Sequence, residues 1–92
     1  MEFRFYKDPD TGLAHCRNHG VLETEVIAVL VNPGRQFRKK DGTLVAEGQT
    51  GAGRYLRIVY RRNDPNSIFV ITAYDLTGNA KRAYRRARRK GK

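Results

Sequence analysis

Residues 54–74 read RYLRIVYRRNDPNSIFVITAY and decide the fold, because they contain two strand patterns joined by a turn. Residues 54–62 alternate, with Leu56, Ile58 and Tyr60 on one face and Tyr55, Arg57 and Val59 on the other. Residues 63–66, NDPN, are typical of a turn. Residues 67–74 are the most apolar run and predict the central strand of a sheet. The short connection between the two runs predicts antiparallel pairing.

Two more strand patterns precede this pair. Residues 35–39 predict a short basic strand and residues 43–50 a longer one, with the turn signal Asp41-Gly42 between them. Residues 51–53, GAG, then close a hairpin into the strand at 54–62. The sequence therefore predicts an antiparallel meander of three or four strands.

The N-terminal third predicts a strand followed by helices. Residues 3–6 alternate and carry aromatic side chains, which favours a short strand. Residues 13–19 could form one or two helical turns that end at Gly20. In residues 22–31 apolar side chains recur at helical spacing, and Pro33 ends the run. Together with the meander and a last helix, these elements predict a small α+β fold.

The C-terminal segment predicts a basic helix that starts at residues 77–79, TGN. A narrow stripe of apolar side chains at helical spacing consists of Ala80, Ala83, Tyr84 and Ala87. Lys and Arg cover the other sides, so this helix can dock weakly by the stripe. No apolar residue follows Ala87, and we expect residues 87–92 to be a frayed basic tail of a single domain spanning residues 1–92.

The composition argues against several classes of protein. The hydrophobic share is 39%, which is too high for a fully disordered chain. No apolar run approaches the roughly 20 residues of a membrane helix. The charged N-terminus, MEFRFYKDPD, lacks the apolar centre of a signal peptide. We therefore expect a cytoplasmic protein without membrane contact.

Cysteine and histidine are too sparse to predict a metal centre. Cys16 is the single cysteine, which excludes an intramolecular disulfide. A helix would place His15 and His19 on one face, but a metal site needs further ligands. We expect the two histidines to serve as polar partners, with no metal and no cofactor.

The net charge of +10 is unevenly distributed. Of the 19 Lys and Arg residues, eight lie in residues 81–92, which contain no acid. Residues 1–80 hold the other eleven together with all nine Asp and Glu residues. The body of the protein is therefore nearly neutral and its end is a polycation, which indicates a nucleic acid or an acidic protein as the partner.

Three stretches occur in order: HCRNHGVLETEVIAVLVNP, VAEGQTGAGRYLRIVY and FVITAYDLTGNAKRAYRR. They contain His19-Gly20-Val21, Asn32-Pro33, the hairpin GQTGAGR at residues 48–54, Ile71-Thr72-Ala73-Tyr74 and Tyr84-Arg85. Over residues 3–86 the chain resembles the BrnT-type branch of the RelE/ParE-like toxin superfamily and its relatives of unassigned function.

This resemblance implies a bacterial type II toxin that cleaves RNA without a metal and is neutralised by an antitoxin. Some relatives act on mRNA in the ribosome. The chain departs from the family pattern at Tyr74 and Gln49, where Arg is common, and at Asp75, near which a basic residue is typical. In these respects it is closer to the relatives of unassigned function.

Metal-free RNA cleavage needs a base for the 2′-hydroxyl, cations for the phosphoryl oxygens and an acid for the departing 5′-oxygen. Histidine suits proton transfer, and arginine binds phosphate oxygens bidentately. A tyrosine takes part only if nearby cations lower its pKa. The candidate catalytic residues are His19, Arg54, Arg57, Tyr74, Tyr84 and Arg85. The candidate RNA-binding residues are Lys81, Arg82, Arg86, Arg88 and Arg89.

Five of the six catalytic candidates also have a structural explanation. Tyr84 lies on the apolar stripe of its helix, where docking explains it as well. Tyr74 could cap the core, Arg57 could lie on a solvated strand face, and Arg54 could flank a turn. His19 could stabilise the C-terminal end of a helix.

The sequence and the resemblance together favour a toxin-like, metal-free endoribonuclease of a type II toxin–antitoxin system. The main alternative is a non-catalytic RNA-binding module on the same fold. A third interpretation is a protein-binding module whose basic helix docks an acidic partner, such as an acidic segment of an antitoxin.

Overall fold

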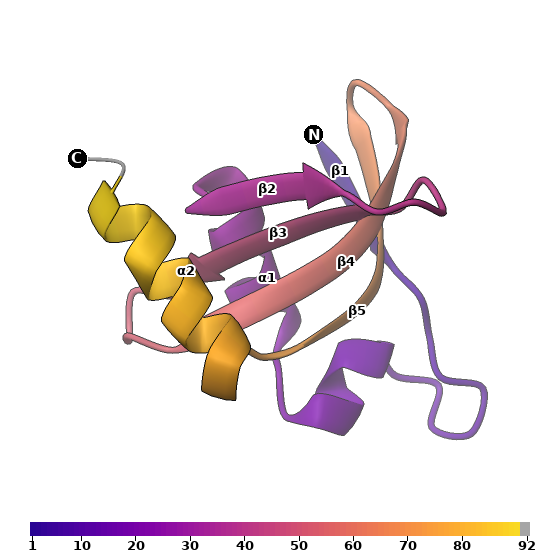
Figure 1. Ribbon diagram of the computed structural model, residues 1–92. Coiled ribbons are helices and arrows are strands. Elements are labelled where there is room, and N and C mark those ends of the chain that lie inside the picture. The colour runs from indigo at the N-terminus through magenta and orange to yellow at the C-terminus, as the bar shows by residue number, and fades with distance from the viewer. Residues whose placement is uncertain (91–92) are drawn as a thin grey trace.

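The longest strand, β4 (Tyr55–Asp64), stands at the centre of a five-stranded sheet. The computed structural model describes the backbone of residues 1–90 and the side chains of residues 1–88 (Figure 1). The strand order is β1-β5-β4-β3-β2, and β2 (Arg35–Arg38), β3 (Leu44–Gln49), β4 and β5 (Ser67–Asp75) form the predicted antiparallel meander. The prediction that residues 67–74 form the central strand is wrong, because β1 pairs on the outer side of the sheet and leaves β5 second from the edge.

The N-terminal strand joins the meander in parallel. β1 (Glu2–Phe5) pairs with residues 67–70 of β5, so the sheet is mixed and has one strand more than the antiparallel meander by itself. The second half of β5 extends beyond β1, and the short 3₁₀ helix η1 (His15–His19) contacts it. Gly20 ends η1 as predicted, with a φ of 73° that a glycine adopts without strain.

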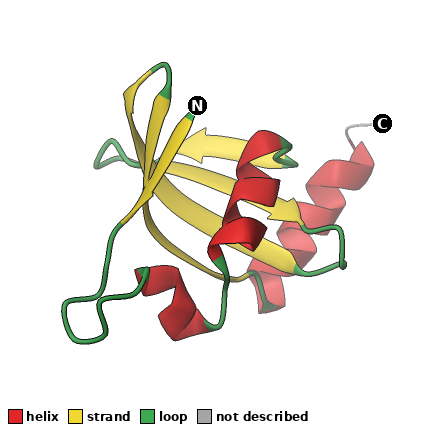
Figure 2. Cartoon of the chain, turned by 180° about the vertical axis from the view of Figure 1, so that it is seen from behind, coloured by secondary structure: helices red, strands yellow, loops and turns green. Residues whose placement is uncertain are grey.

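One face of the sheet carries the hydrophobic core, beneath α1 (Glu23–Val31) (Figure 2). The predicted alternation in β4 is confirmed, because Leu56, Ile58 and Tyr60 are buried in this core. The Leu22 N–H donates to Oε1 of Glu25 at 3.0 Å, so Glu25 satisfies the start of a helix that lacks a hydroxyl cap. The order strand, helices, meander, helix makes this an α+β fold.

The last helix, α2 (Gly78–Lys90), lies on the opposite side of the sheet from α1, across the end where β3 stops and β4 begins (Figures 1 and 2). Its docking residue is Tyr84, whose ring meets the ring of Tyr55 edge-on at 5.9 Å between centroids. The predicted apolar stripe is wrong in part, since Ala83 and Ala87 are exposed. Tyr84 alone supplies a large apolar surface, and its direction sets which side of α2 faces the sheet.

The end of α2 extends past Ala87, where the sequence predicted fraying, and the helix reaches Lys90. Residues 91–92 lie outside the described part of the chain. Within residues 1–90, no helix is both long enough and apolar enough to cross a membrane.

Candidate nucleic-acid interface

The sheet face opposite α1 carries a row of polar side chains that crosses four strands. Arg35, Glu47, Arg57 and Tyr74 are successive cross-strand partners in β2, β3, β4 and β5. We call these four residues the polar row. Since cross-strand partners point to the same face, their side chains emerge together, on the same side of the sheet as α2.

Glu47 is the anion at the centre of the polar row, and its side chain has no exposed surface. Arg57 donates from Nε to Oε2 of Glu47 at 2.7 Å, and Nη1 of Arg35 lies 3.6 Å from Oε1. Oε1 accepts no hydrogen bond from any described residue. Sequence reasoning missed Glu47, although a lone acid in the buried run LVAEGQ was a usable signal.

Arg57 is a predicted catalytic residue, and its neighbours in the polar row raise the pKa of its guanidinium. Its partial burial by itself would lower the guanidinium pKa. The hydrogen bond to Glu47, the neighbouring Tyr74 hydroxyl and the Glu47 charge outweigh that effect, so the pKa of Arg57 is raised. Arg57 is therefore a fixed cation that keeps part of its side chain exposed.

His19 reaches the polar row from the end of η1. Its exposed ring meets the Tyr74 ring in a T-shaped arrangement, with 6.0 Å between the centroids. The ring of His15 packs edge-on against that of His19, with 5.5 Å between the centroids. The structure thus brings together three predicted site residues: His19, Tyr74 and Arg57.

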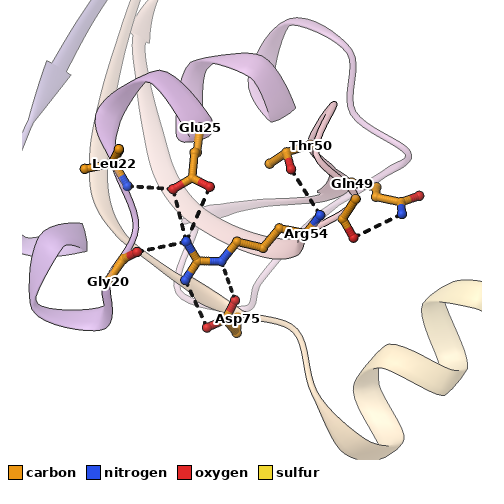
Figure 3. Close-up of polar contacts among 8 residues, drawn as sticks. Gly20, Leu22, Glu25, Gln49, Thr50, Arg54 and Asp75 are labelled. Carbon is orange, nitrogen blue, oxygen red and sulfur yellow. Dashed lines mark hydrogen bonds and ion pairs between the residues drawn. The ribbon is translucent and has the colours of Figure 1, made fainter.

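Arg54 lies on the other side of the sheet, where it joins three segments (Figure 3). Its guanidinium donates to both carboxylate oxygens of Asp75, at 2.7 and 3.1 Å. It also donates to the carbonyl of Gly20 at 2.8 Å and to Oε1 of Glu25 at 3.1 Å. Every nitrogen of this side chain therefore has a protein acceptor, and Arg54 contributes to the fold rather than to the polar row.

Tyr84 is almost entirely buried, with 5% of its surface exposed. A Cβ on Gly34 would stand 2.8 Å from Cζ of Tyr84, so the ring end packs directly on that glycine. Burial raises the pKa of the Tyr84 hydroxyl. This geometry favours the docking interpretation of Tyr84 over the catalytic one.

A pocket of about 380 Å³ opens beside Tyr84, between α2 and the segment that follows α1. Its lining contains two arginines, two tyrosines and two amide side chains, and no acid. The lining residues are Asn32, Pro33, Gly34, Gln49, Tyr55, Tyr84, Arg85 and Arg88. Nη1 of Arg88 donates to the Gly34 carbonyl at 3.2 Å, which links α2 to this segment.

The rest of α2 presents cations to solvent. No ion pair among the described residues uses a side chain of α2. Nζ of Lys81 lies 4.6 Å above the centre of the Tyr55 ring, and Arg82 donates to Asn79. Arg82, Arg85, Arg86 and Arg88 are exposed. The side chain of the predicted contact Arg89 lies outside the described part of the structure.

Within residues 1–90, no group of three or more metal-ligating side chains comes together. Comparison with protein-family models gave no match, and neither curated proteins nor solved structures matched the chain. The polar row, the pocket and the cations of α2 are therefore the observations from which a function can be argued.

Proposed function

We propose that the protein binds single-stranded RNA along α2 and across the adjoining polar row. The observation that carries this proposal is that Arg82, Arg85, Arg86 and Arg88 are exposed and pair with no carboxylate among the described residues. They lie on a helix that Tyr84 holds against the sheet through Tyr55. Cations that no protein carboxylate neutralises attract a polyanion and release its counterions on binding.

The chemistry of these side chains suits single strands. Arginine forks bind phosphate oxygens bidentately, and unpaired bases pack on tyrosine rings. The half-buried ring of Tyr55 lies between Lys81 and Tyr84 at the base of α2. A single strand can therefore meet both phosphate ligands and an aromatic surface within one helix length.

The family resemblance adds a more specific version of this proposal. A meander followed by a basic helix that docks on the sheet supports a RelE/ParE-like domain. In that case the same cations would also receive the acidic segment of an antitoxin, and the target RNA would be ribosome-associated or free mRNA.

RNA cleavage is the second candidate, because one specific observation favours it: His19, Tyr74 and Arg57 are neighbours on one surface. His19 has an exposed imidazole for transfer of the 2′-hydroxyl proton. Arg57, anchored by Glu47, would stabilise the charge on the phosphoryl oxygens. Arg54 and Tyr84 are engaged elsewhere in the fold and have no part in this candidate.

Binding and cleavage can be tested on the same samples. Fluorescence anisotropy with a labelled single-stranded RNA in EDTA should show binding that weakens with salt, with a log–log slope of about −0.7 per phosphate contact. Replacing Arg82, Arg85, Arg86 and Arg88 by Gln should remove most of this slope. Affinity no higher than that of an unrelated protein of equal charge would contradict the proposal.

Gel analysis of the same reactions tests cleavage. We expect products in EDTA if His19, Tyr74 and Arg57 form an active site, and their loss in His19→Ala and Arg57→Ala. Arg4→Ala is a suitable control, because Arg4 is exposed on β1 and pairs only with the exposed Glu2 among described residues. Intact RNA after incubation with wild-type protein would eliminate the cleavage candidate and leave RNA binding standing.

A further inference from the structure

We infer that the pocket beside Tyr84 receives one unpaired nucleotide of the RNA, with its base among the pocket side chains and its phosphate on Arg85 and Arg88. This inference rests on the proposed RNA binding and names the unit that the site recognises. It adds selectivity for an unpaired nucleotide to an otherwise electrostatic surface.

The pocket has the size and construction of a ligand site. Its volume of about 380 Å³ lies in the range of roughly 300–1,000 Å³ that is typical of small-molecule sites. Its walls come from four places in the chain: residues 32–34, the end of β3, the start of β4, and α2. It exists only when α2 is docked, so it is a product of the tertiary structure.

The charge of the lining selects an anion. Arg85 and Arg88 line the pocket, and no acidic residue does. The hydrogen bond from Nη1 of Arg88 to the Gly34 carbonyl holds that guanidinium at the pocket while its other N–H groups stay unpaired among the described residues. Two guanidinium groups one helical turn apart can share the oxygens of one phosphate.

The uncharged lining suits a nucleobase better than an acidic side chain. Tyr55 and Tyr84 provide aromatic surface, against which a planar base packs. The Gln49 amide nitrogen donates to the Gly53 carbonyl at 3.1 Å, which fixes the amide and leaves its oxygen as an acceptor. The Asn32 side chain adds a second amide at the rim. Amides of this kind can hydrogen-bond the edge of an unstacked base.

A matched pair of double variants tests this inference. Arg85→Gln with Arg88→Gln removes the two pocket cations, whereas Arg82→Gln with Arg86→Gln removes two exposed cations of α2 that do not line the pocket. Both pairs lower the charge equally on the same helix. Binding of nucleoside 5′-monophosphates, of the parent nucleosides and of inorganic phosphate is followed by calorimetry and by NMR shifts of pocket amides.

We expect the Arg85/Arg88 pair to weaken nucleotide binding about tenfold or more, and the Arg82/Arg86 pair to weaken it less than about twofold. Both pairs should weaken binding of a longer RNA. Equal losses of mononucleotide affinity in the two pairs would overturn the inference. So would inorganic phosphate that binds as tightly as the nucleotide, or polyglutamate that displaces the nucleotide as well as RNA does.

The two proposals can fail separately. If the longer RNA binds in a salt-dependent way but mononucleotides do not shift the pocket amides, the pocket inference is wrong and RNA binding stands. If neither binds, the proposed function itself is wrong. Gln49→Ala offers an independent check that leaves the charge unchanged: it should weaken the nucleotide more than inorganic phosphate.

Discussion

Arg57 on β4 donates a 2.7 Å hydrogen bond to Glu47 on β3, and the Glu47 side chain is fully buried. The two residues are direct cross-strand partners. A buried carboxylate is tolerated only when cations or donors compensate it, and here two arginines do so. The same contacts hold Arg57 in one position on the face that we assign to RNA.

Glu47→Gln keeps the shape of the side chain and removes its charge. We expect the free energy of unfolding to fall by about 2–3 kcal/mol. This is at or below the lower end of the range of stability losses for a broken buried ion pair, because Arg57 and Arg35 remain partly exposed to water. Urea denaturation measures this loss. Glu2→Gln, which affects an exposed pair with Arg4, should change stability by less than about 1 kcal/mol. Equal stability of wild type and Glu47→Gln would contradict the structural role of Glu47.

Arg54→Lys tests whether Arg54 acts in the fold. Lysine cannot reproduce the bidentate contact with Asp75 while reaching Glu25 and the Gly20 carbonyl. We expect stability to drop by about 2 kcal/mol in chemical denaturation, with RNA affinity unchanged for the folded protein. A specific loss of RNA cleavage at full stability would instead support the catalytic hypothesis drawn from the sequence.

Acid should weaken the contact between Arg54 and Asp75. The hydrogen bond from Arg54 is the largest cause of a lowered pKa at Asp75. A carboxylate whose pKa is lowered in the folded protein stabilises it above the unfolded value of about 3.9, and this contribution is lost as the pH falls through the folded pKa. Denaturation midpoints should therefore fall in the window below about pH 4, and less steeply in Asp75→Asn. In an Arg54→Met background, Asp75→Asn should no longer alter that slope.

Gly34→Ala should disturb the packing of α2 against the segment that contains Gly34. The added methyl group would stand 2.8 Å from Cζ of Tyr84, so the ring and its helix must move. We expect a stability loss of about 1–3 kcal/mol and weaker mononucleotide binding, measured by denaturation and calorimetry. Gly51→Ala is the matched control, since a methyl group there meets nothing within 4 Å. Normal nucleotide binding in Gly34→Ala would contradict the packing of Tyr84 on this glycine.

Tyr84→Phe separates docking from chemistry. Burial raises the pKa of the hydroxyl, so it stays protonated at neutral pH and is a poor base. RNA binding, and cleavage where it occurs, should stay within about twofold of wild type, whereas Tyr84→Ala should lose about 3 kcal/mol of stability. If the rate of RNA cleavage by folded Tyr84→Phe fell by several orders of magnitude, Tyr84 would instead be a catalytic residue.

Part of the candidate site could be predicted from residue types and spacing. The cationic end of the chain and the candidates Arg57, Tyr74 and His19 were identifiable, and these three side chains lie together. Strand alternation by itself places Arg54 and Arg57, an odd number of residues apart, on opposite faces. That signal was present in the sequence, and grouping the two arginines in one site overlooked it.

Local periodicity determined the elements of this protein. Alternating side chains specified the strands, glycine and proline ended η1 and α1, and the segregation of charge marked α2 as the cationic surface that we propose for RNA. These signals are readable because each depends on neighbours within a few residues along the chain.

Only the tertiary structure decided the parallel pairing of β1 with β5, the central position of β4, the burial of Glu47 between two arginines, and the pocket closed by Tyr84. Each of these depends on which distant segments bury one another, and many pairings satisfy the same local pattern. The choice among them is made by the packing of the whole chain, where the free energy of burying a side chain depends on the segments that cover it.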